Sequence, residues 1–268
     1  MAGAARGELS TPEVADQLRA LGVQLGGVLL VHTSFRAVRP VEGGPAGLIR
    51  ALQAALGPDG TLVMLSSAAD DDVPFDPATM AVTPDLGVVA DTFWRLPGVM
   101  RSDHPFAFAA AGAQAAQITA DPLPLPPHIP ESPVGRVYDL NGQVLLLGVG
   151  HDVNTTVHLA ELLFGVPYAV PRYCTVLQGG RPVRVDYLEN DHCTERFALV
   201  EAWLQERGLQ REGPVGHARA RLMRARDVVD GALALLAGDP LVFLHPSSAA
   251  CVQCDAARSS VNAPRVGT

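Results

Sequence analysis

The run Gly27-Val28-Leu29-Leu30-Val31 and the later run Thr61-Leu62-Val63-Met64 are short, continuous and apolar. Runs of this kind are typical of strands that are buried on both faces of a sheet. A helix is expected between them, from about Pro45 to Leu56, and Gly57 closes it. This strand–helix–strand order predicts a layered α/β fold.

The alternation continues along the chain. The apolar run Gln143–Gly148 predicts another buried strand, and a glycine-rich turn leads from it to a helix over Thr155–Phe164 that Asn154 can cap. Residues 120–127 are expected to be irregular because their prolines break both helices and strands. Other helices are expected over residues 11–21, 86–96, 195–207 and 225–236, and other strands over residues 183–187 and 241–244.

The length of 268 residues fits one large domain. No internal repeat or long linker divides the chain, so we expect a single domain over residues 10–258. Residues 1–9 and 259–268 are expected to be flexible ends. Because no apolar run reaches the roughly 20 residues of a membrane helix and residues 1–8 lack a signal-peptide core, we expect a cytoplasmic protein.

Charge and composition exclude several classes of partner and mechanism. The chain has 28 acidic and 20 basic residues, a net charge of −8, and all of the basic residues are arginines. An acidic protein is poorly suited to general nucleic-acid binding, which needs basic surface, but it suits a cationic partner. The absence of lysine excludes a Schiff-base mechanism and a P-loop.

A histidine and a carboxylate stand three residues apart on the helix after the glycine-rich turn. His158 and Glu161 should project from one face of that helix. A carboxylate beside an imidazole fixes its tautomer and raises its basicity, as a general base requires. The alternative is a buried histidine that only completes the packing of the helix.

Acidic side chains are concentrated in two loop regions. Asp70, Asp71 and Asp72 follow the strand that ends at Met64, and a second acidic stretch runs over Asp186–His192. The alternatives are a negatively charged pocket for a polycation and two ordinary solvated loops.

Cys251 and Cys254 form a C-x-x-C pair, which suggests metal or redox chemistry. With Cys193 and either His192 or His245, the pair would complete a tetrahedral structural zinc site. The alternative is a set of ordinary buried thiols.

From about Val14 to Ala257 the sequence resembles the aminoglycoside 3-N-acetyltransferases, most closely the type IV branch that acts on apramycin and gentamicin-like drugs. The general acetyltransferase signature [QR]-x-x-G-x-[GA] is absent, in agreement with the different fold of this family. The matching stretches are Gly27–Arg36, Pro74–Thr79, Thr83–Val89, Arg101–Pro105, Val144–Glu161 and Val185–Cys193.

The resemblance implies a three-layer α/β/α fold on a mixed sheet, with acetyl-coenzyme A as donor and direct transfer without a covalent acyl-enzyme. It implies that His158 is the catalytic base and that Glu189 is its acidic partner, with Glu161 as the rival for that role. It also implies that Asp71 and Asp191 hold ammonium groups of the antibiotic, within an acidic set formed by Asp70, Asp71, Asp72, Glu189 and Asp191.

The resemblance also implies contacts to the coenzyme. Thr155 and Thr156 are candidates to stabilise the oxyanion that forms at the thioester, and arginines suit the phosphates. The other expected coenzyme contacts are His32, Ser34, Phe35, Arg36, Arg101, Ser102, His104, Ser132 and Arg136.

Three other functions are compatible with the sequence. The first is the same acyl transfer to a different amine natural product. The second is a metal-dependent hydrolase that uses His32, His104, His158 and Glu161. The third is a protein that sequesters cationic drugs through Asp70–Asp72 and Asp191 without any reaction.

Overall fold

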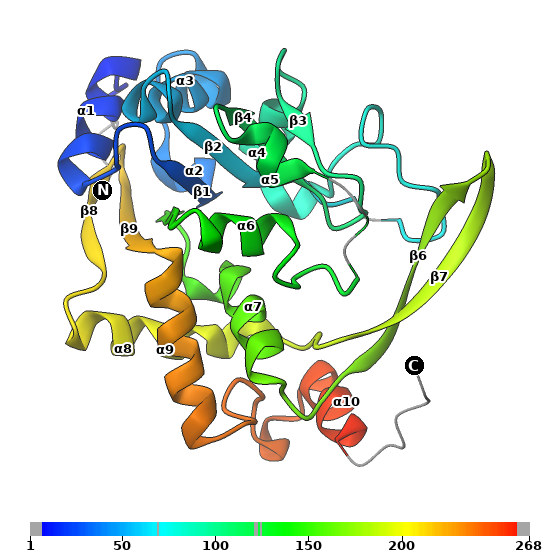
Figure 1. The fold of residues 1–268 in the computed structure, drawn as a ribbon. Helices are drawn as coiled ribbons and strands as arrows, with labels where there is room; N and C mark the ends of the chain where they lie inside the picture. Colours follow the sequence, from blue (N-terminus) through cyan, green and yellow to red (C-terminus); the bar gives the residue numbers. More distant parts are fainter. Residues whose placement is uncertain (1–6, 69, 121–122, 124, 262–268) are drawn as a thin grey trace, which may run out of the picture.

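A computed structural model of the protein describes residues 7–68, 70–120, 123 and 125–261. At its centre is a seven-stranded mixed sheet with strand order β3-β4-β2-β1-β5-β9-β8 (Figure 1). The strands of this sheet are β1 (Val28–Thr33), β2 (Thr61–Leu65), β3 (Met100–Arg101), β4 (Phe108–Gly112), β5 (Gln143–Leu147), β8 (Arg211–Val215) and β9 (Ala218–Arg224). β1 pairs in parallel with β2 and β5, and the other pairs are antiparallel.

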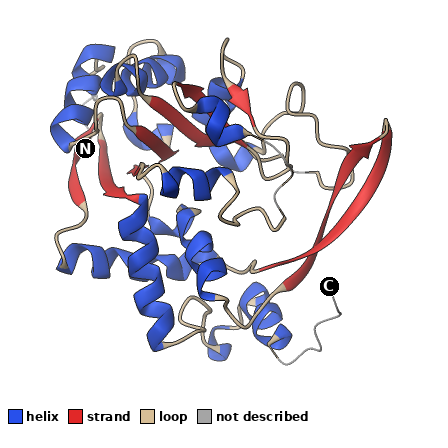
Figure 2. Ribbon diagram, viewed as in Figure 1, coloured by secondary structure: helices blue, strands red, loops and turns tan. Residues whose placement is uncertain are grey.

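A second sheet consists only of β6 (Val170–Gln178) and β7 (Arg181–Glu189). Figure 2 shows this two-stranded ribbon extending away from the main sheet. The α-helices are α1 (Thr11–Leu21), α2 (Phe35–Val38), α3 (Gly44–Leu56), α4 (Gly87–Trp94), α5 (Ala115–Thr119), α6 (Pro133–Asp139), α7 (Thr156–Phe164), α8 (Leu199–Glu206), α9 (Ala225–Gly238) and α10 (Val252–Ser260). Short 3-10 helices are η1 (Pro84–Leu86), η2 (His151–Val153), η3 (Thr194–Ala198) and η4 (Ser247–Ala249).

The main sheet is covered on both faces, and β1 shows how the sequence achieves this. Val28 and Leu30 pack into one buried core with side chains of α5 to α10. Leu29 and Val31 point to the opposite face, where α1, α3 and α4 complete a second core. A strand that is apolar at every position is needed for this arrangement because successive side chains alternate between faces. The expected three-layer α/β/α fold on a mixed sheet is confirmed.

The parallel strands β2, β1 and β5 direct their carboxyl ends to one edge of the sheet. Gly148 makes the turn after β5 with φ +72°, and a Cβ there would come within 2.6 Å of the Ala37 Cβ. The chain then enters α7, where the Asn154 Oδ1 accepts a hydrogen bond from the Thr156 N–H at 3.2 Å. Loops and a helix start therefore meet at the sheet edge where α/β proteins bind ligands.

The structure corrects some of the predicted elements. The strand expected over residues 241–244 is wrong, because this segment is a turn that buries Phe243 and Leu244. At the chain ends, Leu9 forms a β-bridge with Val41 and Ser260 is the last residue of α10. Residues 1–6 and 262–268 lie outside the described residues, as do positions 121, 122 and 124 of the segment that was expected to be irregular.

Among the residues that the structure describes, no helix has both the length and the apolar composition needed to span a bilayer.

Leu30→Ala should lower the free energy of unfolding by about 2–5 kcal/mol, because Leu30 is fully buried between two strands and leaves a cavity when truncated. Urea denaturation followed by circular dichroism measures the change. Leu25→Ala is the matched control, since Leu25 is 70% exposed and should change stability by less than about 0.5 kcal/mol. Equal losses in the two variants would contradict the proposed core.

Candidate active site

His158 and Glu161 lie on one face of α7, and their side chains are hydrogen-bonded. The His158 Nδ1 is 2.8 Å from the Glu161 Oε2. The expectation that Glu189 is the acidic partner of His158 is therefore wrong, and Glu161 holds this position. The physical reason is the helix: residues three apart share a face, whereas Glu189 reaches the region from the end of β7.

The Glu161 carboxylate is fully buried and is surrounded by donors. The Oε2 atom is 2.8 Å from the His158 Nδ1 and 2.9 Å from the Asn190 Nδ2. The Oε1 atom is 2.5 Å from the Tyr168 hydroxyl and 2.7 Å from the His192 Nε2. Burial favours the protonated acid, but these hydrogen bonds and the neighbouring imidazoles outweigh it and lower the pKa of Glu161 to about 2. Glu161 is consequently an anion over the whole physiological pH range.

His192 has acceptors at both of its ring nitrogens. Its Nδ1 lies 2.8 Å from the Cys193 carbonyl oxygen, and its Nε2 lies beside the ionised Glu161. Neither acceptor can donate a proton, so the contacts assign a proton to each ring nitrogen. Burial opposes the cation, but the hydrogen bond and negative charge of Glu161 raise the pKa of His192. The negative charge of Glu161 thus favours the protonated form of His192.

Aromatic rings fix the orientation of His158. Phe197 meets the imidazole edge to face with ring centroids 4.8 Å apart, and His128 stacks on it at 4.6 Å. Because Nδ1 is directed at Glu161, the ring presents Nε2 as its remaining basic nitrogen. The His158 side chain keeps 11% of its surface exposed, so the ring can still be reached from solvent.

Glu189 lies beside His128, the histidine that stacks on His158. Its Oε1 atom is 3.7 Å from the Nδ1 of buried His128. Burial, and after it the charge of Asp191, raise the pKa of Glu189 to about 8, although Arg172 acts in the opposite direction. Glu189 is therefore mostly protonated at neutral pH, unlike Glu161.

The acidic loop and the β6–β7 ribbon are joined. The Tyr173 hydroxyl donates to the Asp72 Oδ1 at 2.8 Å, and the Thr175 hydroxyl donates to the Asp71 carbonyl oxygen at 2.7 Å. Partial burial raises the pKa of Asp71, and the charge of Arg172 counteracts this effect.

At the end of the ribbon, Asp191 forms an ion pair with Arg172. Asp70 caps the loop by accepting a hydrogen bond from the Asp72 N–H at 3.0 Å. The acidic loop thus lies against the β6–β7 ribbon, and Asp191 already has a cationic partner.

Four of the residues expected at the coenzyme carry buried polar atoms without a hydrogen-bond partner among the described residues. They are the Nε2 atoms of His32 and His104 and the hydroxyls of Thr155 and Thr156. Burial lowers the pKa of both His32 and His104 to about 4, so both rings are neutral. A pocket at the carboxyl ends of β1 and β2 is lined by His32, Thr33, Leu65, Leu86 and others. Buried polar groups that lack protein partners are suited to a polar ligand.

The other expected coenzyme residues have different surroundings. Arg101 donates to the carbonyl oxygens of Ser66, Pro77 and Met80, and Arg136 donates to those of Ile118 and Ala120. Both guanidinium groups therefore hold loops in place in this structure.

The serines of this set also bond to backbone. The Ser102 hydroxyl accepts from the Phe108 N–H, and the Ser132 hydroxyl caps α6 through the Gly135 N–H. Ser34, Phe35 and Arg36 follow the carboxyl end of β1, and of these Arg36 is exposed.

The predicted cysteine cluster is assembled away from His158. Cys193, His245 and Cys251 bring their ligand atoms within 4.8 Å of one another, and the Cys254 Sγ is 3.6 Å from the His245 Nδ1. Of the two histidines considered as a fourth ligand, His245 lies in this cluster, whereas His192 is directed at Glu161.

Comparison with known proteins identifies the family. The model of the family described as aminoglycoside 3-N-acetyltransferase matches residues 30–237. The chain is 71% identical over 234 residues to aminoglycoside N(3)-acetyltransferase IV from a Salmonella species, covering 87% of this chain and 90% of that protein. The chain belongs to the aminoglycoside 3-N-acetyltransferase family. The family resemblance seen in the sequence, including its similarity to the type IV branch, is confirmed.

Solved structures of this family agree with the fold. The chain matches the crystal structure of AAC(3)-IVa apoenzyme with a TM-score of 0.94 and 68% identity, over 96% of this chain and 99% of that one. A histidine-to-alanine mutant of AAC(3)-IVa has been solved in complex with a gentamicin, with the same score, identity and coverage. AAC-IIIb in a binary complex with CoASH matches with a TM-score of 0.79 and 25% identity, over 87% of this chain and 97% of that one.

Sequence reasoning did not place four residues beside His158 and the two glutamates. They are His128, Tyr168, Asn190 and His192, which contact His158, Glu161 or Glu189. Asn190 and His192 lie in a stretch that carries the family resemblance, so they could have been inferred. His128 follows a proline-rich segment with no regular spacing, and nothing local in the sequence points to it.

The charge of Glu161 gives a prediction for stability against pH. Its pKa is lowered on folding, so its contribution should be complete above the unfolded value near 4.5 and disappear as pH falls toward 2. Glu161→Gln should therefore be less stable than the wild type at pH 7, and the gap should narrow below about pH 4.5. Urea unfolding at pH 7 and pH 3.5 measures it. A gap that is the same at both pH values would show that Glu161 is not an ionised group in the folded state.

Proposed function

We propose that this protein transfers an acetyl group from acetyl-coenzyme A directly to the 3-amino group of a 2-deoxystreptamine aminoglycoside, and so confers resistance. The observation that carries this proposal is His158, an oriented imidazole with Nε2 available, whose stacking partner His128 has its Nδ1 3.7 Å from the Glu189 Oε1. Family membership supplies the reaction class. The gentamicin complex of AAC(3)-IVa supports the acceptor class, and the CoASH complex of AAC-IIIb supports the donor.

The base must take a proton from the attacking amine as the new bond forms. The Nδ1–H of His158 donates to Glu161, so Nε2 can accept that proton. The negative charge of Glu161 then stabilises the imidazolium that results. His192 and Tyr168 keep the carboxylate ionised and fixed while this happens. In the AAC(3)-IVa mutant a histidine is replaced and gentamicin is still bound, as expected for a group that acts in transfer rather than in drug binding.

The acceptor is a polycation, and the acidic side chains of Asp71, Asp72 and Glu189 suit its ammonium groups. Glu189 is largely neutral before the drug arrives. An ammonium group close to it would favour the ionised form, so drug binding and loss of the Glu189 proton should be coupled. Asp191 can contribute only together with or in exchange for Arg172.

The thioester needs hydrogen-bond donors for the negative charge that develops on its carbonyl oxygen when the amine attacks the carbonyl carbon. The buried hydroxyls of Thr155 and Thr156 at the start of α7 are free to donate. The carbon–sulfur bond then breaks, and the sulfur of coenzyme A takes up the proton that His158 accepted from the amine and leaves as the thiol. No serine or cysteine nucleophile is required. Holding the amine and the thioester together contributes a large part of the acceleration.

The location of the enzyme in the cytoplasm stays a prediction.

His158→Ala should lower kcat by roughly 100- to 10,000-fold, because the amine then loses its proton acceptor. Free-thiol release from acetyl-coenzyme A with gentamicin or apramycin measures the rate. Calorimetric titration with coenzyme A is the folding control and should show unchanged binding. Near-normal turnover in this variant would exclude His158 as the base.

Asp71→Asn should raise the KM for the aminoglycoside by roughly three- to tenfold, equivalent to about 1 kcal/mol for a partly exposed charge, with little change in kcat. The effect should be larger at low ionic strength. Asp59→Asn is the matched control, because Asp59 is exposed just before the amino end of β2. An unchanged KM at low salt would exclude Asp71 from the drug site.

The same kinetic assay separates the proposed acceptor from other amines. A drug blocked at its 3-amino group should not release thiol, whereas apramycin and gentamicin should. Equal turnover with unrelated amines would instead assign the enzyme to a different natural product, and stoichiometric binding without thiol release would assign it to sequestration.

A further inference from the structure

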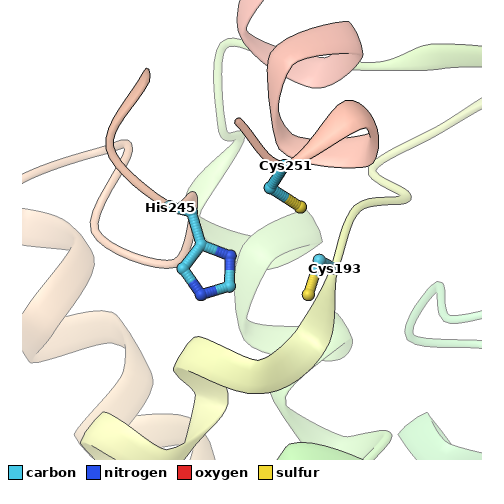
Figure 3. Close-up of side chains that lie close together, drawn as sticks. All are labelled: Cys193, His245 and Cys251. Carbon is cyan, nitrogen blue, oxygen red and sulfur yellow. The ribbon is translucent and has the colours of Figure 1, made fainter. Parts of the chain in front are cut away.

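Three segments far apart in the sequence meet at a cluster of sulfur and imidazole ligands. Cys193 precedes η3, His245 lies between α9 and η4, and Cys251 immediately precedes α10. Figure 3 shows these three side chains directed into one small volume. Their ligand atoms all lie within 4.8 Å of one another. None of these three residues belongs to the set that surrounds Glu161.

A fourth ligand completes the set. Cys254 lies one helical turn after Cys251, is fully buried, and has its Sγ 3.6 Å from the His245 Nδ1. In a tetrahedral zinc site, Zn–S bonds of about 2.3 Å and Zn–N bonds of about 2.0 Å place the two ligand atoms about 3.5 Å apart. The observed separation fits two ligands of one ion. We propose that Cys193, His245, Cys251 and Cys254 bind a structural zinc ion.

The second ring nitrogen of His245 supports this assignment. Its Nε2 is 3.4 Å from the Glu195 Oε2, while its Nδ1 faces the Cys254 sulfur. Histidines that bind zinc usually donate their other N–H to a carboxylate or carbonyl, which fixes the tautomer. The arrangement leaves Nδ1 as the metal-binding nitrogen. Three soft sulfurs and one imidazole favour zinc over harder divalent ions.

A redox role for the C-x-x-C pair explains less of this geometry. A disulfide between Cys251 and Cys254 needs no third cysteine and no histidine, yet Cys193 and His245 both converge on the pair. Four protein ligands would also fill a tetrahedral site. The ion is therefore structural and has no open position for a substrate.

The proposed zinc site connects to the region of His158 through Cys193. The Cys193 carbonyl oxygen accepts the hydrogen bond of His192 Nδ1, and His192 Nε2 contacts Glu161. An ion that ties Cys193 to α10 would hold His192 against Glu161. Zinc thus acts as a positioning element for the carboxylate that orients His158.

Metal analysis of the purified full-length protein tests the proposal without reference to acetyl transfer. The wild type should contain about one zinc per chain, and Cys251→Ser and Cys254→Ser should lose most of it. Cys174→Ser is the matched control, because Cys174 is a buried cysteine on β6 and should leave the zinc content unchanged. Zinc-free wild-type protein that does not take up added zinc would overturn the proposal, as would equal zinc loss in all three variants.

A measurement on the wild type covers the case in which the variants do not fold. Protein in which Co²⁺ replaces the ion should show the ligand-field absorption of a tetrahedral thiolate site, and removal by a chelator should lower the melting temperature. Added zinc should restore that temperature. An octahedral Co²⁺ spectrum, or a Cys251–Cys254 disulfide in thiol counts, would contradict the zinc site even if the proposed acetyl transfer is correct.

Discussion

The buried negative charge of Glu161 is the constraint on which the rest of the site depends. Removing a carboxylate from water costs several kcal/mol unless the protein supplies donors. Here four donors come from three parts of the chain: His158 on α7, Tyr168 before β6, and Asn190 and His192 after β7. Charge-assisted hydrogen bonds of this kind are the strong ones. Satisfying this one anion therefore joins α7 to both strands of the ribbon at its open end and, by the same contacts, orients His158.

Two carboxylates a few side chains apart are held in opposite states by their surroundings. Glu161 has a pKa of about 2 because donors surround it, and Glu189 has a pKa of about 8 because burial and neighbouring acids disfavour its charge. Separation of this kind lets one acid serve as a permanent anion and the other respond to an arriving cation. In the proposed reaction, the first carboxylate stabilises the protonated base, and the second recognises the drug.

Local sequence patterns predicted the layered α/β fold and the helix that carries His158. They failed where strand pairing or side-chain packing outweighs the intrinsic secondary-structure propensity of a segment. β4 reads Phe-Ala-Ala-Ala-Gly, a poor strand sequence, and is a strand because it pairs with β2 and β3. Residues 241–244 look like a strand and form a turn. Arg101 and Arg136 were expected to bind phosphate because of their charge. In the structure their guanidinium groups donate hydrogen bonds to backbone carbonyl oxygens of remote loops.

Spacing within single segments was enough to predict the α/β core, the shared helical face of His158 and Glu161, and the C-x-x-C pair. Three other features became visible only in the folded chain. Glu161 and not Glu189 is bonded to His158, His128 stacks on His158, and Cys193 and His245 lie beside the cysteine pair. These contacts join residues that are far apart in the chain. Their positions follow from sheet order and loop paths, which no local pattern encodes.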